Sequence, residues 1–412
     1  MRVLVLHNKY RFRGGEDESS ESEDRVLSIK GHTIFRHEQD NATISKNNDM
    51  RTAAQAIFNW QSFKRVRQLI RTLRPDVVDI HNFFPLISPS AHYACAKEGI
   101  PAVQTLHNFR LLCPGATLYR AGKPCEDCIG TTIPLAAVRH KCYRDSRLGS
   151  ASVAGMLATH NLLGTWHKHV TLFIALSQFS RNKFVEAGLP AHKIKVKPNF
   201  VDPDPGVGDG SGNYLLFVGR LVREKGIETL LRAWRRLQTP VPLKIIGEGP
   251  LGDWVAKQCG EIPNVEWLGP QPVSTVYTMM GHAKSVVFPS EWYEPFGRVA
   301  VEAFAKGTPV IAADIGAVAE IVDEGRTGVL FKAGDADSLA AAVERFRVDH
   351  EGSRRMRREA RQEFESKYTA ERNCGLNVDI FREAIELSSK SGHGVTADRP
   401  AACSSDKFIR VF

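Results

Sequence analysis

Residues 294–311 read EPFGRVAVEAFAKGTPVI, and this stretch contains one complete repeat of an α/β fold. A loop ends in Glu294, a helix begins near Phe296 and Gly297, and the apolar run Val310–Ala312 has the composition of a short buried strand. Repeats of this kind predict a parallel sheet that is covered by helices on both faces.

The same alternation extends in both directions from this stretch. Residues 202–213, DPDPGVGDGSGN, interrupt it with a run of Pro, Gly, Asp and Ser that is typical of an interdomain linker. We therefore predict two doubly wound, Rossmann-like α/β domains in tandem, with ligands at the carboxyl ends of the strands, in a central cleft that the domains face. The predicted strands are 3–6, 33–35, 77–80, 101–106, 172–176 and 194–196 before the linker, and 214–218, 243–246, 265–268, 285–288, 310–312 and 328–331 after it.

The domain boundaries follow from this division. An N-terminal domain is expected at 1–205 and a C-terminal domain at 206–370, followed by a helix at 371–390 that crosses back to the first domain. The polar end, 391–412, has the composition of a flexible tail. Within the first domain, 52–74 has the apolar periodicity of one long amphipathic helix.

The composition is that of a globular protein, with 412 residues, 42% hydrophobic and 25% charged. No apolar run is long enough for a transmembrane helix, and no cleavage site follows the apolar N-terminus, so we expect a cytoplasmic protein. The net charge is +9, with basic clusters at 64–74 and 354–358. Solvated helix faces explain these clusters; the alternatives are peripheral binding to the anionic inner face of the plasma membrane and attraction of a phosphate-bearing acceptor. Nucleic acid is not favoured as a partner, because neither interleaved aromatic residues nor a binding motif accompanies them.

Two cations follow the predicted strand at 214–218. That strand ends in Gly219, and Arg220 and Lys225 lie in the next loop and helix start. Cations at the carboxyl end of a strand would stabilise the negative charge that develops on a departing diphosphate. Surface ion pairing is the alternative explanation.

Two carboxylates lie on either side of a predicted helix N-terminus. Glu294 and Glu302 are eight residues apart, which is not a same-face spacing, so Glu294 would act from the loop and Glu302 from the helix. The helix N-terminus offers free N–H groups and a positive dipole end to a phosphate, and Gly297 would let the backbone approach closely. The carboxylates would then accept hydrogen bonds from sugar and ribose hydroxyls; a capping acid and an ordinary helix-face glutamate are the alternative.

Three motifs in a fixed order resemble those of a known family. They are GRLVREKG at Gly219–Gly226, GEGP at Gly247–Pro250, and the stretch 294–311 quoted above. The set resembles the family 4 glycosyltransferases (glycosyl transferases group 1) of the GT-B fold, over residues 1 to 385 and most strongly over 214–335. The resemblance implies a retaining hexosyl- or related glycosyltransferase that moves a sugar from a nucleotide diphosphate sugar to a glycan, lipid-linked or small-molecule acceptor in polysaccharide or glycoconjugate biosynthesis.

The resemblance also implies roles for single residues. Arg220 and Lys225 would hold the donor diphosphate, while Glu294 would bind hydroxyls of the transferred sugar. In the first domain, His107 follows the strand at 101–106 and would contact the donor sugar. Residues implied to line the donor site are Gly14, Gly15, Gly219, Gly247, Leu268, Phe296, Gly297, Arg298, Val299 and, on the ribose, Glu302.

No cofactor or catalytic metal is implied. In the family, the acceptor attacks from the face that the leaving phosphate occupies, without an enzymatic nucleophile. The sequence has no Asp-x-Asp in the position that a metal-dependent transferase would use, since Asp335-Ala-Asp337 lies late, beside a helix start. Arg220, Lys225 and the helix dipole would take the place of Mg²⁺.

Four of the eight cysteines lie in an insertion at about 108–148. The C-x-x-C spacing of Cys125 and Cys128 suits zinc, and Cys113 and Cys142 would complete a tetrahedral structural site. Free thiols and a redox role are the alternatives.

The acceptor side is marked less clearly. His81, Asn82 and Phe83 follow the strand at 77–80 and would contact an acceptor, with the aromatic ring either stacked on a sugar or packed under the next helix. Two other functions are a non-catalytic scaffold that binds sugar nucleotides and a GT-B epimerase. The presence of Lys225 and Glu294 favours the transferase.

Overall fold

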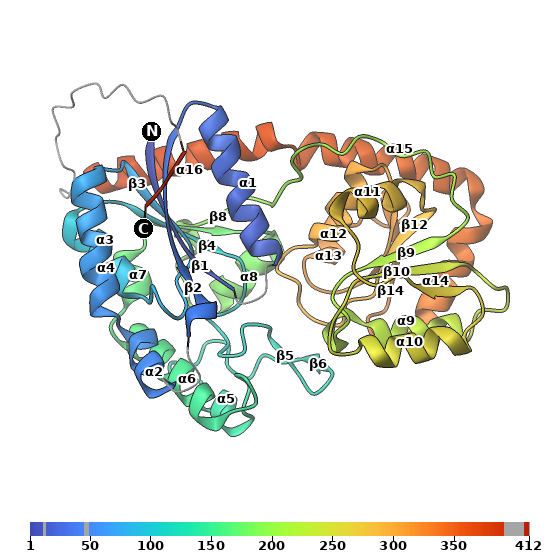
Figure 1. Cartoon of the computed structure of the whole chain (residues 1–412), viewed down its shortest axis with the longest axis horizontal. Coiled ribbons are helices and arrows are strands. Elements are labelled where there is room, and N and C mark those ends of the chain that lie inside the picture. Colours follow the sequence, from blue (N-terminus) through green and yellow to red (C-terminus); the bar gives the residue numbers. More distant parts are fainter. Residues whose placement is uncertain (11–13, 45–48, 391–407, 412) are drawn as a thin grey trace. The chain divides into compact units, whose positions relative to one another are not determined.

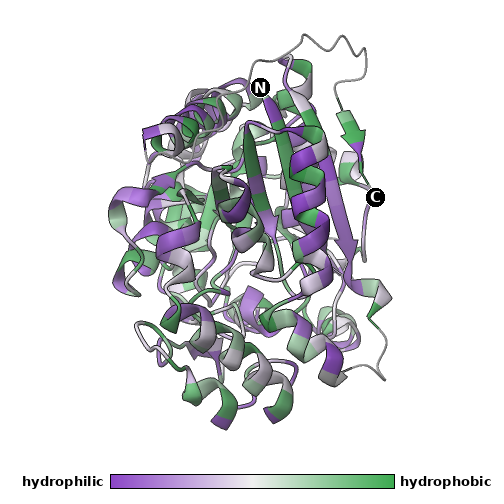
Figure 2. Cartoon of the chain, turned by 90° about the vertical axis from the view of Figure 1, so that its left-hand side faces the viewer, coloured by the Kyte–Doolittle hydropathy of each residue, from purple (hydrophilic) through white to green (hydrophobic). Residues whose placement is uncertain are grey.

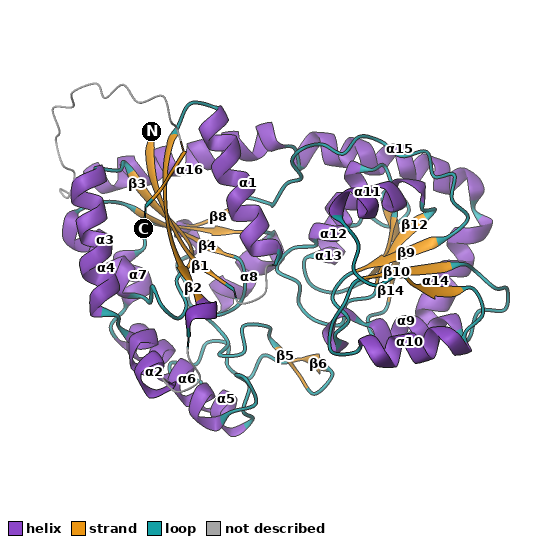
Figure 3. Cartoon of the chain, in the orientation of Figure 1, coloured by secondary structure: helices purple, strands orange, loops and turns teal. Residues whose placement is uncertain are grey.

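The computed structural model describes residues 1–10, 14–44, 49–390 and 408–411. Contacts divide the chain into two compact units, each a parallel sheet with helices on both faces (Figures 1 and 3). Unit 1 comprises Met1–Thr117, Glu126–Lys197 and Glu371–Phe412, and unit 2 comprises Leu118–Cys125 and Pro198–Ala370.

The segment predicted as a linker belongs to unit 2. The backbone N–H groups of Gly208, Gly210 and Gly212 donate to the carbonyls of Lys306, Gly281 and His282, respectively. The boundary therefore lies between residues 197 and 198 rather than between 205 and 206, because these backbone hydrogen bonds attach the segment to the second sheet's helices.

Unit 1 is built on a seven-stranded sheet in the order β15-β2-β1-β3-β4-β7-β8, with all pairings parallel. The central strands are apolar runs, and Val3, Leu4, Val5 and Leu6 are fully buried. The strands are β1 (Arg2–Lys9), β2 (Thr33–Asp40), β3 (Val77–Asn82), β4 (Ala102–Leu106), β7 (Leu172–Ala175), β8 (Ile194–Val196) and β15 (Phe408–Arg410).

Strand β15 corrects the prediction of a tail for its part of the chain. Phe408–Arg410 pair in parallel with Ile34–Arg36 of β2, and His37 Nδ1 lies 3.1 Å from the carbonyl oxygen of Val411. The rest of the predicted tail, 391–407 and 412, lies outside the described residues. The prediction missed this strand because its partner β2 is far away in the sequence and because the polar residues that precede it led to a tail being predicted for the whole segment, although Phe408 and Ile409 are residue types that favour strands.

Helices cover both faces of this sheet, and one of them was predicted wrongly. The pattern at 52–74 forms two helices, because the Asn59 side chain accepts hydrogen bonds from the N–H groups of Gln61 and Ser62 and so begins a new helix there. The helices of unit 1 are α1 (Gly15–Ile29), α2 (Asp49–Ile57), α3 (Trp60–Leu73), α4 (Ser90–Glu98), α5 (Leu135–Arg139), α6 (Arg147–Leu162), α7 (Thr165–His169), α8 (Gln178–Glu186) and α16 (Ala370–Lys390).

Unit 2 has a six-stranded parallel sheet in the order β11-β10-β9-β12-β13-β14. Helix α9 packs on α14, and α11 and α15 pack on α12 (Figure 1). The elements are β9 (Leu215–Val218), α9 (Ile227–Trp234), β10 (Leu243–Ile246), α10 (Gly252–Glu261), β11 (Val265–Trp267), α11 (Val273–His282), β12 (Ser285–Phe288), α12 (Arg298–Ala305), β13 (Val310–Ala313), α13 (Val318–Ile321), β14 (Gly328–Phe331), α14 (Ala336–Val348) and α15 (His350–Lys367), with the two-residue strands β5 (Tyr119–Arg120) and β6 (Lys123–Pro124).

Hydropathy follows the layers of the fold. In Figure 2 single helices carry both hydrophilic and hydrophobic stretches, as expected where one helix face packs on a sheet. Within the described parts of the chain, no helix combines the length and the apolar character needed to cross a membrane.

Candidate active site

In unit 2, two glycine loops meet backbone to backbone where β9 and β10 end. The Gly219 N–H donates to the carbonyl of Ile246, and the Leu221 N–H donates to that of Glu248. A Cβ on Gly247, whose φ is +137°, would lie 1.9 Å from the Gly219 carbonyl oxygen. Only glycine fits there, so Gly247 allows the two loops to approach at the edge where strands of this fold bind ligands.

Lys225 and Glu294 come from different loops and form an ion pair. Lys225 follows β9, Glu294 follows β12, and the lysine Nζ lies 2.5 Å from Glu294 Oε1. The same oxygen accepts hydrogen bonds from Ser290 Oγ at 2.9 Å and Trp292 Nε1 at 2.8 Å. Glu294 is buried, and three donors converge on one of its carboxylate oxygens.

Arg220 differs from Lys225 in having no fixed partner. Its side chain is exposed, and among the described residues it takes part in no ion pair or side-chain hydrogen bond. The guanidinium beside the Gly219 turn is thus free to bind an anion in a bidentate way.

Helix α12 begins at the same edge of the sheet. Gly297 is its N-cap residue, and a Cβ there would lie 3.1 Å from Val318 Cγ2, so a side chain would crowd helix α13. Phe296 is buried, and Arg298 Nε donates to Glu302 Oε1 at 2.9 Å. The first turn of α12 therefore offers its backbone N–H groups beside Glu294.

The segment after β11 joins this cluster through Gly247. The Gly247 N–H donates to the Gly269 carbonyl, and Trp267 Nε1 donates to the Gly247 carbonyl at 2.9 Å. Leu268, half-buried, lies between these two contacts in sequence. The predicted site residues Gly219, Arg220, Lys225, Gly247, Leu268 and Glu294 thus lie in loops that follow the carboxyl ends of strands, whereas Arg298, Val299 and Glu302 lie on helix α12.

In unit 1, His107 follows β4 and is only partly buried. Its Nε2 lies 2.8 Å from His81 Nδ1, and the two rings are stacked with centroids 5.1 Å apart. Burial, and the positive charge on His81, hold the pKa of His107 well below its usual value. His107 is therefore a neutral imidazole at physiological pH.

A second polar cluster in unit 1 surrounds Glu16, which the sequence analysis did not single out. Tyr10 Oη donates to Glu16 Oε2 at 2.8 Å, and Asn108 Nδ2 lies 3.3 Å from the same oxygen. Burial raises the pKa of Glu16 to about 7. Glu16 directly follows Gly14 and Gly15, and Asn108 directly follows His107, so the cluster joins two segments that were predicted to bind the donor.

The residues predicted to contact an acceptor are buried, which corrects that prediction. His81, Asn82 and Phe83 are only 3%, 7% and 5% exposed. The Phe83 ring packs on His92 and Trp166, and Asn82 Nδ2 donates to the Asn8 carbonyl. These contacts give the three side chains a structural role, and so little of their surface is accessible that they are poorly placed to contact an acceptor.

The four clustered cysteines do not form the proposed zinc site. Cys125 belongs to unit 2, whereas Cys113, Cys128 and Cys142 belong to unit 1. In the described residues, no three cysteine sulphurs lie within 4.8 Å of one another. Tetrahedral coordination by these thiolates is therefore wrong for this chain.

Parts of the basic clusters have structural roles. Arg67 and Arg71 on α3 both bind Glu98, and Arg357 on α15 donates to the carbonyls of Gly208, Gly281 and Ala283. Asp335 of the late Asp-Ala-Asp triplet caps α14, accepting from the N–H groups of Asp337 and Ser338.

Two family models match consecutive parts of the chain. Residues 35–205 match the model described as Glycosyltransferase Family 4, and residues 204–363 match Glycosyl transferases group 1. Together the two models account for most of the described chain.

Curated relatives match over part of their length. A glycogen synthase of Mycobacterium tuberculosis is 38% identical over 41% of this chain and 42% of its own length. A D-inositol 3-phosphate glycosyltransferase of Corynebacterium kroppenstedtii is 32% identical over 42% and 40%. The chain thus spans about two fifths of the length of these relatives. An uncharacterized protein from the cps region of Klebsiella pneumoniae is 26% identical over 64% of both chains.

Solved structures show the same fold over nearly the whole chain. Anabaena HepE, solved in complex with UDP and glucose, has a TM-score of 0.66 at 18% identity, covering 95% of this chain and all of its own. Sucrose-phosphate synthase of Thermosynechococcus elongatus has a TM-score of 0.68 at 15% identity, covering 94% of this chain.

Proposed function

The chain belongs to the group 1, family 4 glycosyltransferases and has their GT-B fold, and from this premise we propose that it transfers a sugar from a nucleoside diphosphate donor to an acceptor hydroxyl with retention of anomeric configuration. The observation that carries the proposal is the cluster at the carboxyl ends of the strands of unit 2. There an exposed arginine with no side-chain partner among the described residues, an ion-paired lysine and glutamate, and a helix N-terminus lie together.

The donor diphosphate is the natural ligand for the cations of this cluster. Arg220 would make a bidentate contact with the phosphates, and the first N–H groups of α12 would donate to the same group. Lys225 would bind the phosphate as a point charge while Ser290 and Trp292 hold the Glu294 carboxylate in place. The buried carboxylate then accepts hydrogen bonds from hydroxyls of the transferred sugar.

The proposed reaction is a substitution at the anomeric carbon. The bond between this carbon and the diphosphate oxygen breaks, and the diphosphate leaves with the electron pair. The acceptor oxygen forms the new bond on the same face, and its proton goes to the departing phosphate. Arg220, Lys225 and the α12 dipole stabilise the charge that develops on that phosphate.

The donor base and the acceptor are proposed from similar proteins. HepE was solved with UDP, so UDP-sugars are the first donors to test. The similarity to a protein named as a glycogen synthase supports a role in polysaccharide biosynthesis, and a glycan or lipid-linked acceptor is proposed with it. Cytoplasmic location and peripheral membrane contact stay predictions.

A donor screen tests the proposal at its first step. UDP, GDP, ADP and several of their sugar conjugates are added to the protein, and the unfolding temperature is measured, because a ligand of the folded state raises it. We expect one diphosphate to raise this temperature in the wild type and to do so much less in Arg220→Ala. Arg223→Ala serves as the matched control, because Arg223 lies in the same loop and is also exposed but pairs with Glu228. No shift with any diphosphate would contradict the proposal.

A further inference from the structure

A row of three side chains in unit 1 leads from the buried sheet to His107. Asp79 and His81 occupy alternate positions on β3, and both are almost completely buried. His81 Nε2 lies 3.1 Å from Asp79 Oδ2, and His81 Nδ1 lies 2.8 Å from His107 Nε2. His107, at the end of the row, is partly exposed.

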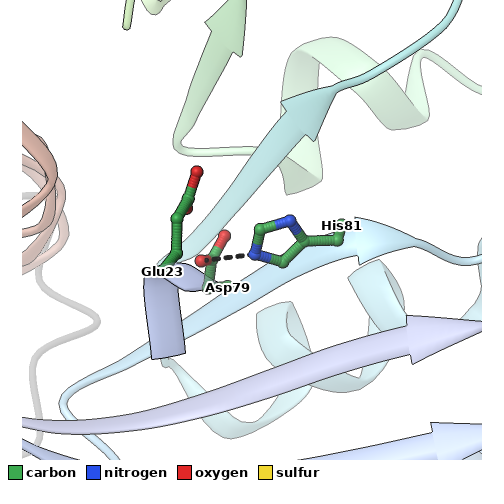
Figure 4. Close-up of side chains that lie close together, drawn as sticks. All are labelled: Glu23, Asp79 and His81. Atoms are coloured by element: carbon green, nitrogen blue, oxygen red, sulfur yellow. Dashed lines mark hydrogen bonds and ion pairs between the residues drawn. The ribbon is translucent and has the colours of Figure 1, made fainter. Parts of the chain in front are cut away.

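Glu23 approaches the same row from helix α1. Figure 4 shows its carboxylate beside Asp79 and His81, and ligand atoms of the three residues lie within 4.8 Å of one another. Such a trio has the residue types of a metal site, but a cation is already present. Lys197 Nζ lies 2.5 Å from Glu23 Oε1, and Asn377 Nδ2 donates to Glu23 Oε2. The positive charge of Lys197 neutralises the negative charge of Glu23, and Asp79 has His81 as its partner. We therefore assign no metal to this group.

Hydrogen-bond chemistry restricts where the protons lie. An ionised Asp79 can only accept, so His81 Nε2 must carry a proton. Asp79 Oδ1 has no hydrogen-bond partner among the described residues, and a buried carboxylate without a countercharge is costly. The buried His81, which already contacts Asp79, can supply the positive countercharge. To be positively charged, its ring must carry a second proton, on Nδ1.

The consequence for His107 follows directly. If His81 Nδ1 donates, His107 Nε2 must accept, and a neutral His107 then carries its proton on Nδ1. Burial alone would lower the pKa of His81, but the carboxylates of Asp79, Glu23 and Asp24 together outweigh burial and raise it. The other charged or titratable groups near the pair are Glu16 on α1, which interacts with the charge of His81, and His7 on β1 and Lys197 after β8, which lower the pKa of His107.

We propose that Asp79 and His81 are positioning residues that hold His107 as the neutral tautomer protonated on Nδ1. The Nδ1–H is then the single ring donor that His107 can present to a hydroxyl of the donor sugar, and this last step rests on the proposed function. His107 binds and orients in this scheme. It does not exchange protons with the substrate, because its acceptor nitrogen is occupied by His81.

Nitrogen NMR tests the tautomer without any substrate. Full-length protein is labelled with ¹⁵N-histidine, and long-range ¹H–¹⁵N spectra are recorded at about pH 7, with signals assigned from His81→Asn and His107→Asn. We expect both His81 nitrogens to be protonated, and His107 to be protonated on Nδ1 only. In Asp79→Asn, His81 should lose its charge. The buried His92, which binds Gln104 and Pro89 outside this row, should be unchanged. A neutral His81, or a His107 protonated on Nε2, in the wild type overturns the proposal.

A rescue experiment separates positioning from general stability. An asparagine at position 81 places its amide N–H near the site of His81 Nδ1, so the double variant Asp79→Asn/His81→Asn keeps a donor to His107 without buried charges. We expect His81→Leu to lower kcat about tenfold or more, which matches loss of one oriented hydrogen bond, at an unchanged donor KM. The double variant should recover most of that loss. Equal losses in both variants would contradict the inference, whereas a wild type with the expected spectrum but no transfer would contradict only the proposed function.

Discussion

Units 1 and 2 are both parallel α/β sheets, but their candidate residues reach their places in different ways. In unit 2, Lys225, Gly247 and Glu294 each lie in a short motif, and the loops that carry them meet at one edge of the sheet. In unit 1, His107 is supported by Asp79 and His81, which belong to another strand and to no motif. The charged ligand site is thus recognisable along the chain, whereas the support of a single histidine depends on buried contacts between distant segments.

The largest effect is expected in unit 2, from Glu294→Gln. The change leaves Lys225 without its countercharge and removes a buried carboxylate acceptor, while the side-chain shape is kept. Transfer should fall by about 10²–10³, or about 3–4 kcal/mol, as for other preorganised polar groups at a reacting centre. The rate of nucleoside diphosphate release measures this fall.

The matched control is Glu363→Gln. Glu363 is equally buried, and its carboxylate binds Arg326 and Lys367 away from the cluster. If both variants lost activity alike, the loss from Glu294→Gln would reflect folding rather than chemistry.

A pair of glycine variants sharpens the comparison between the units. Gly247→Ala would put a Cβ 1.9 Å from a backbone oxygen at a positive φ, and should cost about 3 kcal/mol of unfolding free energy. Gly14→Ala meets nothing within 4 Å at an ordinary φ of −139°, and should leave stability nearly unchanged. Denaturant unfolding of both variants checks this; equal stabilities would mean that the glycine loops of unit 2 are not constrained as described.

Arg220→Ala should weaken donor binding without affecting the fold. The exposed guanidinium has no partner in the described chain, so its loss removes only contacts to a ligand. We expect diphosphate affinity to fall about 10- to 100-fold, as for one or two charge-assisted hydrogen bonds. Calorimetric titration measures the affinity, and a lower unfolding temperature in the absence of ligand would show instead that Arg220 has a structural role.

The smallest effect concerns Glu16 in unit 1. Burial raises its pKa to about 7 in the folded state, so the folded protein binds a proton that the unfolded chain releases near pH 4.5. Stability from this proton is present at low pH and is lost as pH rises towards 7. Between about pH 5 and pH 8 the wild type should lose about 2 kcal/mol relative to Glu16→Gln. Parallel pH profiles of unfolding for the two proteins would contradict the buried position of Glu16.

The sequence allowed most of the second sheet to be predicted, for a physical reason. Strands β10, β12 and β14 have the predicted bounds, because each is a short apolar run that is bounded by Gly, Pro or polar residues. The residues of the candidate donor site lie in loops after such strands, and parallel strands bring their carboxyl ends to one edge.

What could not be predicted depends on contacts between distant segments. Strand β15 pairs with β2 across more than 370 residues, and the Asn59 cap divides a periodic pattern that reads as one helix. The burial of His81 and Phe83 was also invisible in the sequence, because a polar or aromatic residue after a strand looks the same whether it faces solvent or the next helix.

The most direct test of the central claim is transfer itself. The protein is incubated with sugar-labelled UDP-, GDP- and ADP-sugars and with glycan and lipid extracts, and both the released diphosphate and the labelled product are measured. We predict diphosphate release matched by label in an acceptor, with the anomeric configuration of the donor retained. This transfer should be absent in Glu294→Gln and kept in Glu363→Gln. Tight binding of a nucleotide sugar with neither hydrolysis nor transfer to any extract would contradict the account and favour a binding protein.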